Sequence, residues 1–308
     1  MRHRRSIAPW LAHVFLLLLT GIVLFAPKAR ATVRAPDFFL AAIALMELGF
    51  LASLWRKKRK GTLTNGACDI ILFVWALLIV WELATSVFSV TNPVLVPCPE
   101  NVFDSFFREW RTMLLNVRYS LALLSVGFLS GLVLALLLGL SVGWIPRLRN
   151  FAYPIANVMA PIPAIVFSPY LVSIMPSFRS ASATVIILGV FWPTFLTTIN
   201  RVNAIEPRIL DSARMLHLNN ATMIFHILLP YVMPGIVSGL KVSVTTSVLM
   251  LNFAELMGAT HGMGYYIQNS ITYANYTRAV AGILCIGIFV TILNRLVAVI
   301  QKHAIRWR

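Results

Sequence analysis

Long apolar runs recur along the chain, and most of them end at basic or polar residues. A helix of about 20 apolar residues crosses the hydrocarbon core of a bilayer, so each run predicts a transmembrane helix. The expected spans cover residues 10–26, 38–55, 70–90, 120–144, 151–175, 183–200, 231–257 and 279–300. The pattern therefore predicts an all-α polytopic membrane protein with about eight transmembrane helices.

Residues 211–230 break this pattern, because polar and apolar residues alternate there at helical spacing. The residues at positions 217–220 favour a turn, since His and Asn tolerate left-handed backbone angles. We predict two short helices joined by that turn and lying outside the lipid, where they contact a soluble partner. Their shared apolar surface is expected to contain Ala213, Leu216, Ile224, Ile227 and Leu228.

Small residues recur every four positions along two of the expected spans. Such ladders let a neighbouring helix approach closely within lipid. The predicted helix-packing positions are Gly127, Gly131, Ala135, Gly139 and Gly143 in one span, and Gly235 and Gly239, followed by Ser243 and Ser247, in another. A third span carries Pro154, Pro161, Pro163 and Pro169, and it cannot be straight because each proline removes a helical hydrogen bond.

Composition agrees with the membrane class, since 59% of the 308 residues are apolar and 12% are charged. The net charge of +16 lies at the ends of apolar runs rather than in one patch, which argues against nucleic acid as a partner. The N-terminal run is either a cleaved signal peptide or a retained span, and its basic flanks favour retention. Cys68, Cys98 and Cys285 have neither metal-site nor disulfide spacing.

The basic residues also predict orientation. If residues 211–230 are cytoplasmic, the cytoplasmic segments hold 18 of the 26 Lys and Arg residues, including the run at 56–60. This excess places both termini in the cytoplasm of an inner (plasma) membrane protein. Lys28, Arg30 and Arg34 then lie on the outer side, against the rule.

No catalytic or cofactor chemistry is apparent. The chain lacks a G-x-x-x-x-G-K-[S/T] stretch and any His, Cys or acidic cluster at metal spacing. We therefore expect no enzyme activity, no catalytic residue, no metal and no cofactor on this chain. Glu255 is an intramembrane carboxylate, which is costly unless it faces protein or water. It is either a residue at the outer mouth of a pathway or, preferably, a hydrogen-bonded helix tie between subunits.

Several motifs carry a family resemblance. Residues 211–213, Leu216 and the closing Leu229-Pro230 match the E-A-A, Leu and L-P positions of the loop in binding-protein-dependent ABC importer permeases. Similar stretches are W-E-L-A at 81–84, V-P-C-P at 96–99, A-E-L-M-G-A at 254–259 and G-M-G-Y at 262–265. The chain resembles the type I, MetI-like permeases, and within them the nitrate, sulfonate and taurine group.

The resemblance implies that the last six spans form a type I ABC importer permease core. It implies two extra N-terminal helices (1–69), a first core helix with a periplasmic segment (70–110), a permease domain (111–301) with a coupling loop at 204–230, and a basic tail (302–308). It also implies docking of a separate ATPase on the loop. The implied coupling residues are Asp211, Ser212, Ala213, Arg214, Leu216, His217, Leu218, Asn219, Asn220, Leu229 and Pro230.

The implied partners are ABC ATPase subunits, a second permease subunit in a homo- or heterodimer, an extracytoplasmic solute-binding protein and the lipid bilayer. The implied cargo is a small solute such as a sulfonate, taurine or a nitrate-like anion. Two features depart from the family: His217 replaces its Gly, and its W-F-G-I-G is absent. A divergent scaffold, or a heterodimer partner with weakened coupling, is the alternative. A secondary transporter ranks last, because no half-repeat is visible.

Overall fold

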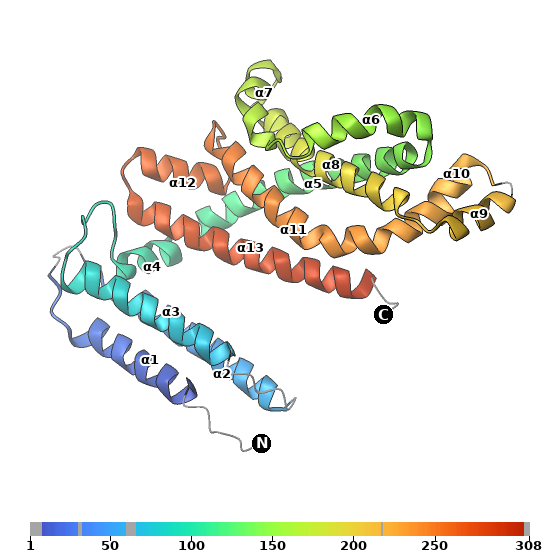
Figure 1. Cartoon of the computed structure of the whole chain (residues 1–308). Helices are drawn as coiled ribbons and strands as arrows, with labels where there is room; N and C mark the ends of the chain where they lie inside the picture. Colours follow the sequence, from blue (N-terminus) through green and yellow to red (C-terminus); the bar gives the residue numbers. More distant parts are fainter. Residues whose placement is uncertain (1–7, 30–32, 60–65, 217, 305–308) are drawn as a thin grey trace. The chain divides into compact units, whose positions relative to one another are not determined.

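The computed structural model describes residues 8–29, 33–59, 66–216 and 218–304, and all regular structure in those ranges is helical (Figure 1). The chain divides into two compact units, which are described separately. The first unit comprises residues 1–112 and 269–285, and the second comprises 113–268 and 286–308.

The first unit is built on the N-terminal helices. Its elements are α1 (Ala8–Phe25), α2 (Asp37–Arg59), α3 (Gly66–Glu82) with a π-helical turn (Leu83–Val87), α4 (Pro99–Arg108), and the adjoining ends of α5, α12 and α13. Leu19, Phe39 and Trp75 are fully buried where α1, α2 and α3 meet. His13 Nδ1 of α1 lies 3.0 Å from Glu47 Oε1 of α2. The carboxylate of Glu47, which lies in the middle of an apolar helix, therefore has a polar neighbour on the adjacent helix.

The second unit contains the remaining helices. They are α5 (Trp110–Trp144), α6 (Pro146–Met159), the 3₁₀ turn Ala164–Phe167, α7 (Ser168–Ile174), α8 (Phe178–Asn203), α9 (Pro207–Met215), α10 (Asn220–Thr222), a π-helical segment (Met223–Leu228), α11 (Leu229–Leu256), α12 (Met263–Thr272) and α13 (Tyr276–Ala304). Leu140, Val202 and Leu228 belong to a core cluster shared by α5, α8 and the π-helical segment.

The glycines of α5 lie against α8. A Cβ added at Gly127 would be 2.7 Å from Ile186 Cβ, and one at Gly131 would be 2.9 Å from the carbonyl oxygen of Ile187. A Cβ added at Gly139 would be 2.8 Å from Thr198 Cβ, and one added at Gly143 would be 2.8 Å from Val202 Cβ. Ala135 is fully buried. The backbones of α5 and α8 can approach this closely only because these positions hold Gly or Ala.

Six described helices are long and apolar enough to cross a membrane: Asp37–Trp55, Gly66–Val87, Trp110–Trp144, Phe178–Asn203, Asn220–Leu256 and Tyr276–His303. A seventh span is the proline-rich segment 146–174, whose two halves meet at 87°. The shorter apolar helix Trp10–Phe25 brings the total to the predicted number of about eight. The prediction that the proline-rich span is not straight is also confirmed.

The prediction for residues 211–230 is partly wrong. The first helix, α9, is short and ends at Met215, but the second is continuous with the membrane-spanning helix Asn220–Leu256. Leu216 is 69% exposed and does not join the apolar surface that buries Ala213, Ile224 and Leu228. The helix ends at Met215, so the helical spacing that was used to predict the apolar face does not apply to Leu216.

Candidate functional site

The helix α9 has one face packed against the second unit. Ala213 is 5% exposed and belongs to the same core cluster as Leu140, Val202 and Leu228. On the preceding turn, Ile205 joins this cluster. Packing at these positions fixes α9 on the ends of α5 and α8, so a force applied to α9 is transmitted to those helices.

The opposite face of α9 is exposed and partly apolar. Asp211 and Ser212 are exposed, and the Ser212 hydroxyl donates to the carbonyl of Arg208 at 2.8 Å. Met215 is 81% exposed beside the exposed Leu216. The motif match missed Met215, although its spacing from Ser212 on a helix indicates a common face. This exposed apolar pair is the part of the loop most suited to contact a separate protein.

The return from the loop is fixed by two asparagines. Asn219 is extended at φ −69°, and its side chain caps the next helix by accepting from Thr222 N at 2.7 Å. Asn219 therefore builds the turn as an N-cap, without a left-handed conformation. Trp144 Nε1 donates to Asn220 Oδ1 at 3.0 Å, which ties the loop to the end of α5.

Of the other five predicted loop residues, the structure describes the side chains of three. Leu218 and Leu229 are half-buried, and Pro230 is exposed at the second residue of α11, directly after the π-helical segment. His217 and the side chain of Arg214 lie outside the described residues.

Glu255 has a full set of hydrogen bonds near the end of α11. It is 2% exposed, and its carboxylate accepts from Ser120 Oγ at 2.7 Å and from Gly264 N at 2.8 Å. Gly262 adopts φ +116°, and a Cβ there would lie 2.4 Å from the Glu255 carboxylate. The arrangement makes Glu255 a tie between α11, α5 and the start of α12.

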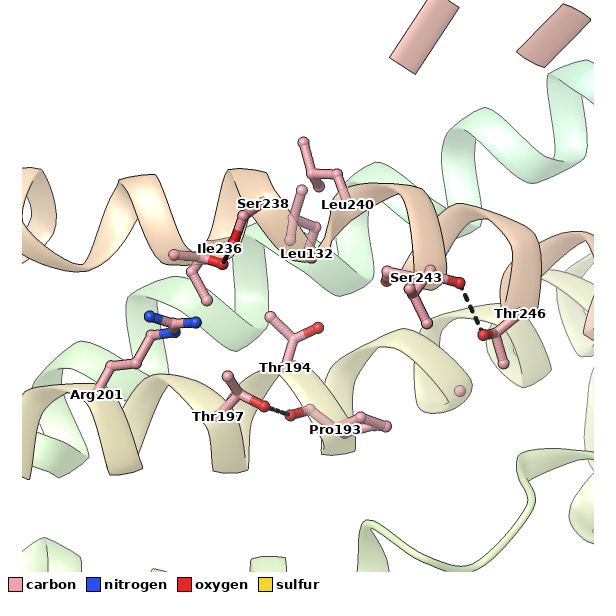
Figure 2. A pocket seen from close by; sticks show the side chains of 14 residues that line it. Leu132, Pro193, Thr194, Thr197, Arg201, Ile236, Ser238, Leu240, Ser243 and Thr246 are labelled. Atoms are coloured by element: carbon pink, nitrogen blue, oxygen red, sulfur yellow. Dashed lines mark hydrogen bonds between the residues drawn. The ribbon is translucent and has the colours of Figure 1, made fainter. Parts of the chain in front are cut away.

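Gly235 and Gly239 do not repeat the packing seen on α5. A Cβ at Gly239 would meet nothing within 4 Å, and one at Gly235 would fall on the guanidinium of Arg201. Both glycines line a cavity of about 350 Å³ between α8 and α11, to which Leu132 of α5 contributes (Figure 2). Within this chain, the predicted close packing is absent at Gly239, whereas Gly235 allows the close approach of the Arg201 side chain from α8.

Two buried carboxylates meet one lysine in the first unit. Lys28 Nζ contacts Glu82 Oε1 and lies 2.7 Å from Glu100 Oε1, and neither glutamate side chain is exposed. Ser86 Oγ donates to the second oxygen of Glu100 at 3.0 Å. Burial favours the neutral amine, but the contacts with Glu100 and Glu82 outweigh it and raise the pKa of Lys28 above 10.5.

A second ionic cluster holds α4. Asp104 is 2% exposed and contacts Arg34, and its other oxygen accepts from Arg108 Nε at 2.7 Å. Burial alone would raise the pKa of Asp104, but hydrogen bonds from Arg108 and Arg34 lower it below 3.8. Arg34 N also donates to Asn101 Oδ1 at 2.9 Å. Hydropathy gave no signal for the contacts of Arg34, because its partners are far apart from it in sequence.

No group of three or more His, Cys, Asp or Glu side chains in the described ranges could hold a metal ion. The two candidate sites of the second unit are therefore the loop at 204–230 and the cavity between α8 and α11.

Comparisons with known proteins give the family. The model of the family described as "Binding-protein-dependent transport system inner membrane component" matches residues 131–307, more than half of the chain. The putative aliphatic sulfonates transport permease protein SsuC of Bacillus subtilis is 22% identical, over 82% of this chain and 92% of that protein. The taurine transport system permease protein TauC of Escherichia coli is 23% identical, over 82% and 92%. The nitrate import permease protein NrtB of Leptolyngbya laminosa is 24% identical, over 90% and 95%.

Solved structures show the same fold. A chain of the MetNI methionine ABC transporter, in an inward-facing conformation, matches with a TM-score of 0.50 and 21% identity, over 63% of this chain and 96% of that one. A chain of a bacterial alginate ABC transporter, in complex with a periplasmic protein that binds an alginate pentasaccharide, matches with a TM-score of 0.53 and 16% identity, over 82% and 97%. The chain therefore belongs to the binding-protein-dependent transport system inner membrane component family and is a permease component of an ABC importer.

Proposed function

We propose that this permease forms the translocation pathway for a small anionic solute, of the sulfonate, taurine or nitrate-like kind, and is driven by a separate ATPase that docks on residues 211–230. It works with a second permease subunit, identical or not, and with an extracytoplasmic solute-binding protein. Both termini face the cytoplasm. The solute class is supported by the three relatives, which are named as sulfonate, taurine and nitrate permeases.

The observation that carries the coupling proposal is the division of α9 into two faces. Ala213 anchors the helix in the core, while Met215 and Leu216 project from its end with 81% and 69% of their surfaces exposed. Burial of such side chains by a partner is favourable by about 25 cal/mol per Å² of apolar surface. Movement of a bound ATPase would then move α9 together with the ends of α5 and α8, because they share one core cluster.

The structure selects the substitutions that test this proposal. Ala213→Glu would bury a charge in the permease core and disrupt folding, so it does not report on docking. We propose the double variant Met215→Glu and Leu216→Glu, which places charge on the exposed face and leaves Ala213 in place. The matched control is Leu148→Glu, since Leu148 is also an exposed apolar residue, at the start of α6.

The experiment is a pull-down of the ATPase encoded beside this chain, followed by substrate-stimulated ATP hydrolysis in proteoliposomes. Wild type and Leu148→Glu are expected to retain the ATPase, and the double variant to lose it while inserting normally. Equal retention by all three proteins would exclude the end of α9 as the docking site. It would then favour a divergent scaffold or a heterodimer partner with weakened coupling.

A further inference from the structure

The cavity between α8 and α11 has one unusual feature, which is a single cation in a mostly apolar and hydroxyl-bearing surface. Arg201, in the last turn of α8, is the only charged residue among the described residues that line it. Figure 2 shows its guanidinium directed toward α11, with Thr194 and Thr197 on the same face of α8. The side chain of Arg201 is half-buried, and a partly desolvated cation attracts an anion more strongly than a fully hydrated one does.

Arg201 lacks a partner within the described chain. Its Nε is buried and has no hydrogen-bond acceptor. The guanidinium lies where a Cβ of residue 235 would stand, 1.8 Å from Nη1, so Gly235 leaves the space that it occupies. At Gly239 the space beside the helix is open. The two glycines thus make room for the guanidinium and for a ligand next to it.

The hydroxyl groups around the cavity differ in whether their protons are already used. Thr197 Oγ1 donates to the carbonyl of Pro193 at 2.7 Å, and Thr246 Oγ1 donates to the carbonyl of Val242 at 2.8 Å. Ser238 Oγ donates to the carbonyl of Gly235 at 2.8 Å. The hydroxyls of Thr194 and Ser243, by contrast, make no hydrogen bond to the other residues drawn in Figure 2. Of these two, Thr194 lies on the same face of α8 as Arg201, so its hydroxyl can donate to an acceptor beside the guanidinium.

We propose that Arg201 and Thr194 form an anion-binding subsite in the permease, specific for a small ligand with several acceptor oxygens such as a nitrate or sulfonate group. A planar guanidinium binds such groups with two parallel hydrogen bonds. A cavity of about 350 Å³ has room for an anion of this size. The proposal rests on the proposed function, because it identifies residues that would contact the transported anion.

The first test measures binding without transport. The purified chain is treated with phenylglyoxal, an arginine reagent, and modification of each arginine is mapped by mass spectrometry with nitrate, methanesulfonate or neutral glycerol present. We expect nitrate and methanesulfonate to protect Arg201 and glycerol to have no effect. Arg149, which donates to Asn203 Oδ1 at 2.7 Å, is the internal control and should not respond to the anions. Equal modification of Arg201 in all conditions would overturn the proposal.

The second test measures uptake by proteoliposomes that contain the permease, its ATPase and its binding protein. Loss of one charge-assisted contact corresponds to about 10- to 100-fold weaker binding, so Arg201→Gln should raise the half-saturating nitrate or methanesulfonate concentration by that factor. Arg201→Lys should be intermediate, and Arg149→Gln should match wild type. Thr194→Val should weaken uptake several-fold, whereas Thr197→Val should not, since its hydroxyl already donates within α8.

The outcomes separate the two proposals. If wild-type uptake requires ATP and Arg201→Gln transports both anions like wild type, the subsite is refuted and the transport function stands. If wild type takes up neither anion but Arg201 is still protected from phenylglyoxal, the subsite stands and the proposed cargo is wrong. Every variant is compared after its melting temperature and insertion match those of wild type, so that a folding defect is not read as lost binding.

Discussion

The contact of Lys28 with Glu82 and Glu100 leads to a quantitative prediction. Both carboxylates are fully buried, and Lys28 is the cation in contact with them. Lys28→Met keeps an unbranched apolar stem but leaves two buried carboxylates without a cation. They can then stay buried only by taking up protons or by separating, and separation detaches α4 from the end of α3.

The magnitude follows from the burial. Removing one partner of a buried ion pair costs about 3–5 kcal/mol. Lys28 is 23% exposed, so water screens part of the interaction and the lower figure of about 3 kcal/mol applies. That value corresponds to a rise of about 100-fold in the population of molecules in which this part of the first unit is open. The triple variant with Glu82→Gln and Glu100→Gln should recover most of the loss, because no buried charge is left.

Cys98 supplies the assay. It is 1% exposed and immediately precedes the first residue of α4, so its thiol reacts only when this region opens. In a background with Cys68→Ser and Cys285→Ser, the rate of labelling by a maleimide dye reports the open population. We expect labelling about 100-fold faster in Lys28→Met than in the parent. A change below about threefold, or a triple variant as fast as the single one, would refute the reasoning about the buried carboxylates.

Two further predictions concern packing and pH. Gly131→Ala should lower stability by about 1–3 kcal/mol, because its Cβ would lie 2.9 Å from a backbone oxygen, whereas Gly239→Ala, which meets nothing within 4 Å, should leave the melting temperature unchanged. The lowered pKa of Asp104 stabilises the fold above the ordinary pKa of 3.8, and the effect is lost as pH falls through the lowered value. Pepsin should therefore cleave near α4 increasingly below about pH 4 in wild type, and Asp104→Asn should remove this dependence.

Hydropathy was sufficient to predict the spans, because lipid leaves no alternative to a helix for satisfying the backbone. The same argument predicted the broken span at 146–174, since proline removes hydrogen bonds that lipid cannot replace. These predictions depend on residues close together in sequence. The position of the turn before Asn220 was also predictable, but its mechanism, an N-cap by Asn219, was not.

The sequence could not indicate which neighbour a small residue faces. Gly131 and Gly239 have the same spacing and the same small size, yet one lies against α8 and the other faces a cavity. A series of small residues along one helix shows only that another helix can approach closely. Which helix does so depends on the whole fold. Arg201 was likewise counted only as a basic residue at the end of a span, because its unpartnered Nε is visible only in three dimensions.

The ionic contacts of the first unit also bear on the proposed orientation. Four cations that the span count places on the outer side have carboxylate partners: Lys28 with Glu82 and Glu100, Arg34 and Arg108 with Asp104, and Arg278 with Glu109 at 2.8 Å. A cation that is neutralised by a partner in the fold is explained by that contact, and its position does not require a cytoplasmic location. Lys28 and Arg34 therefore do not count against the proposed cytoplasmic termini, because their charges are paired within the fold.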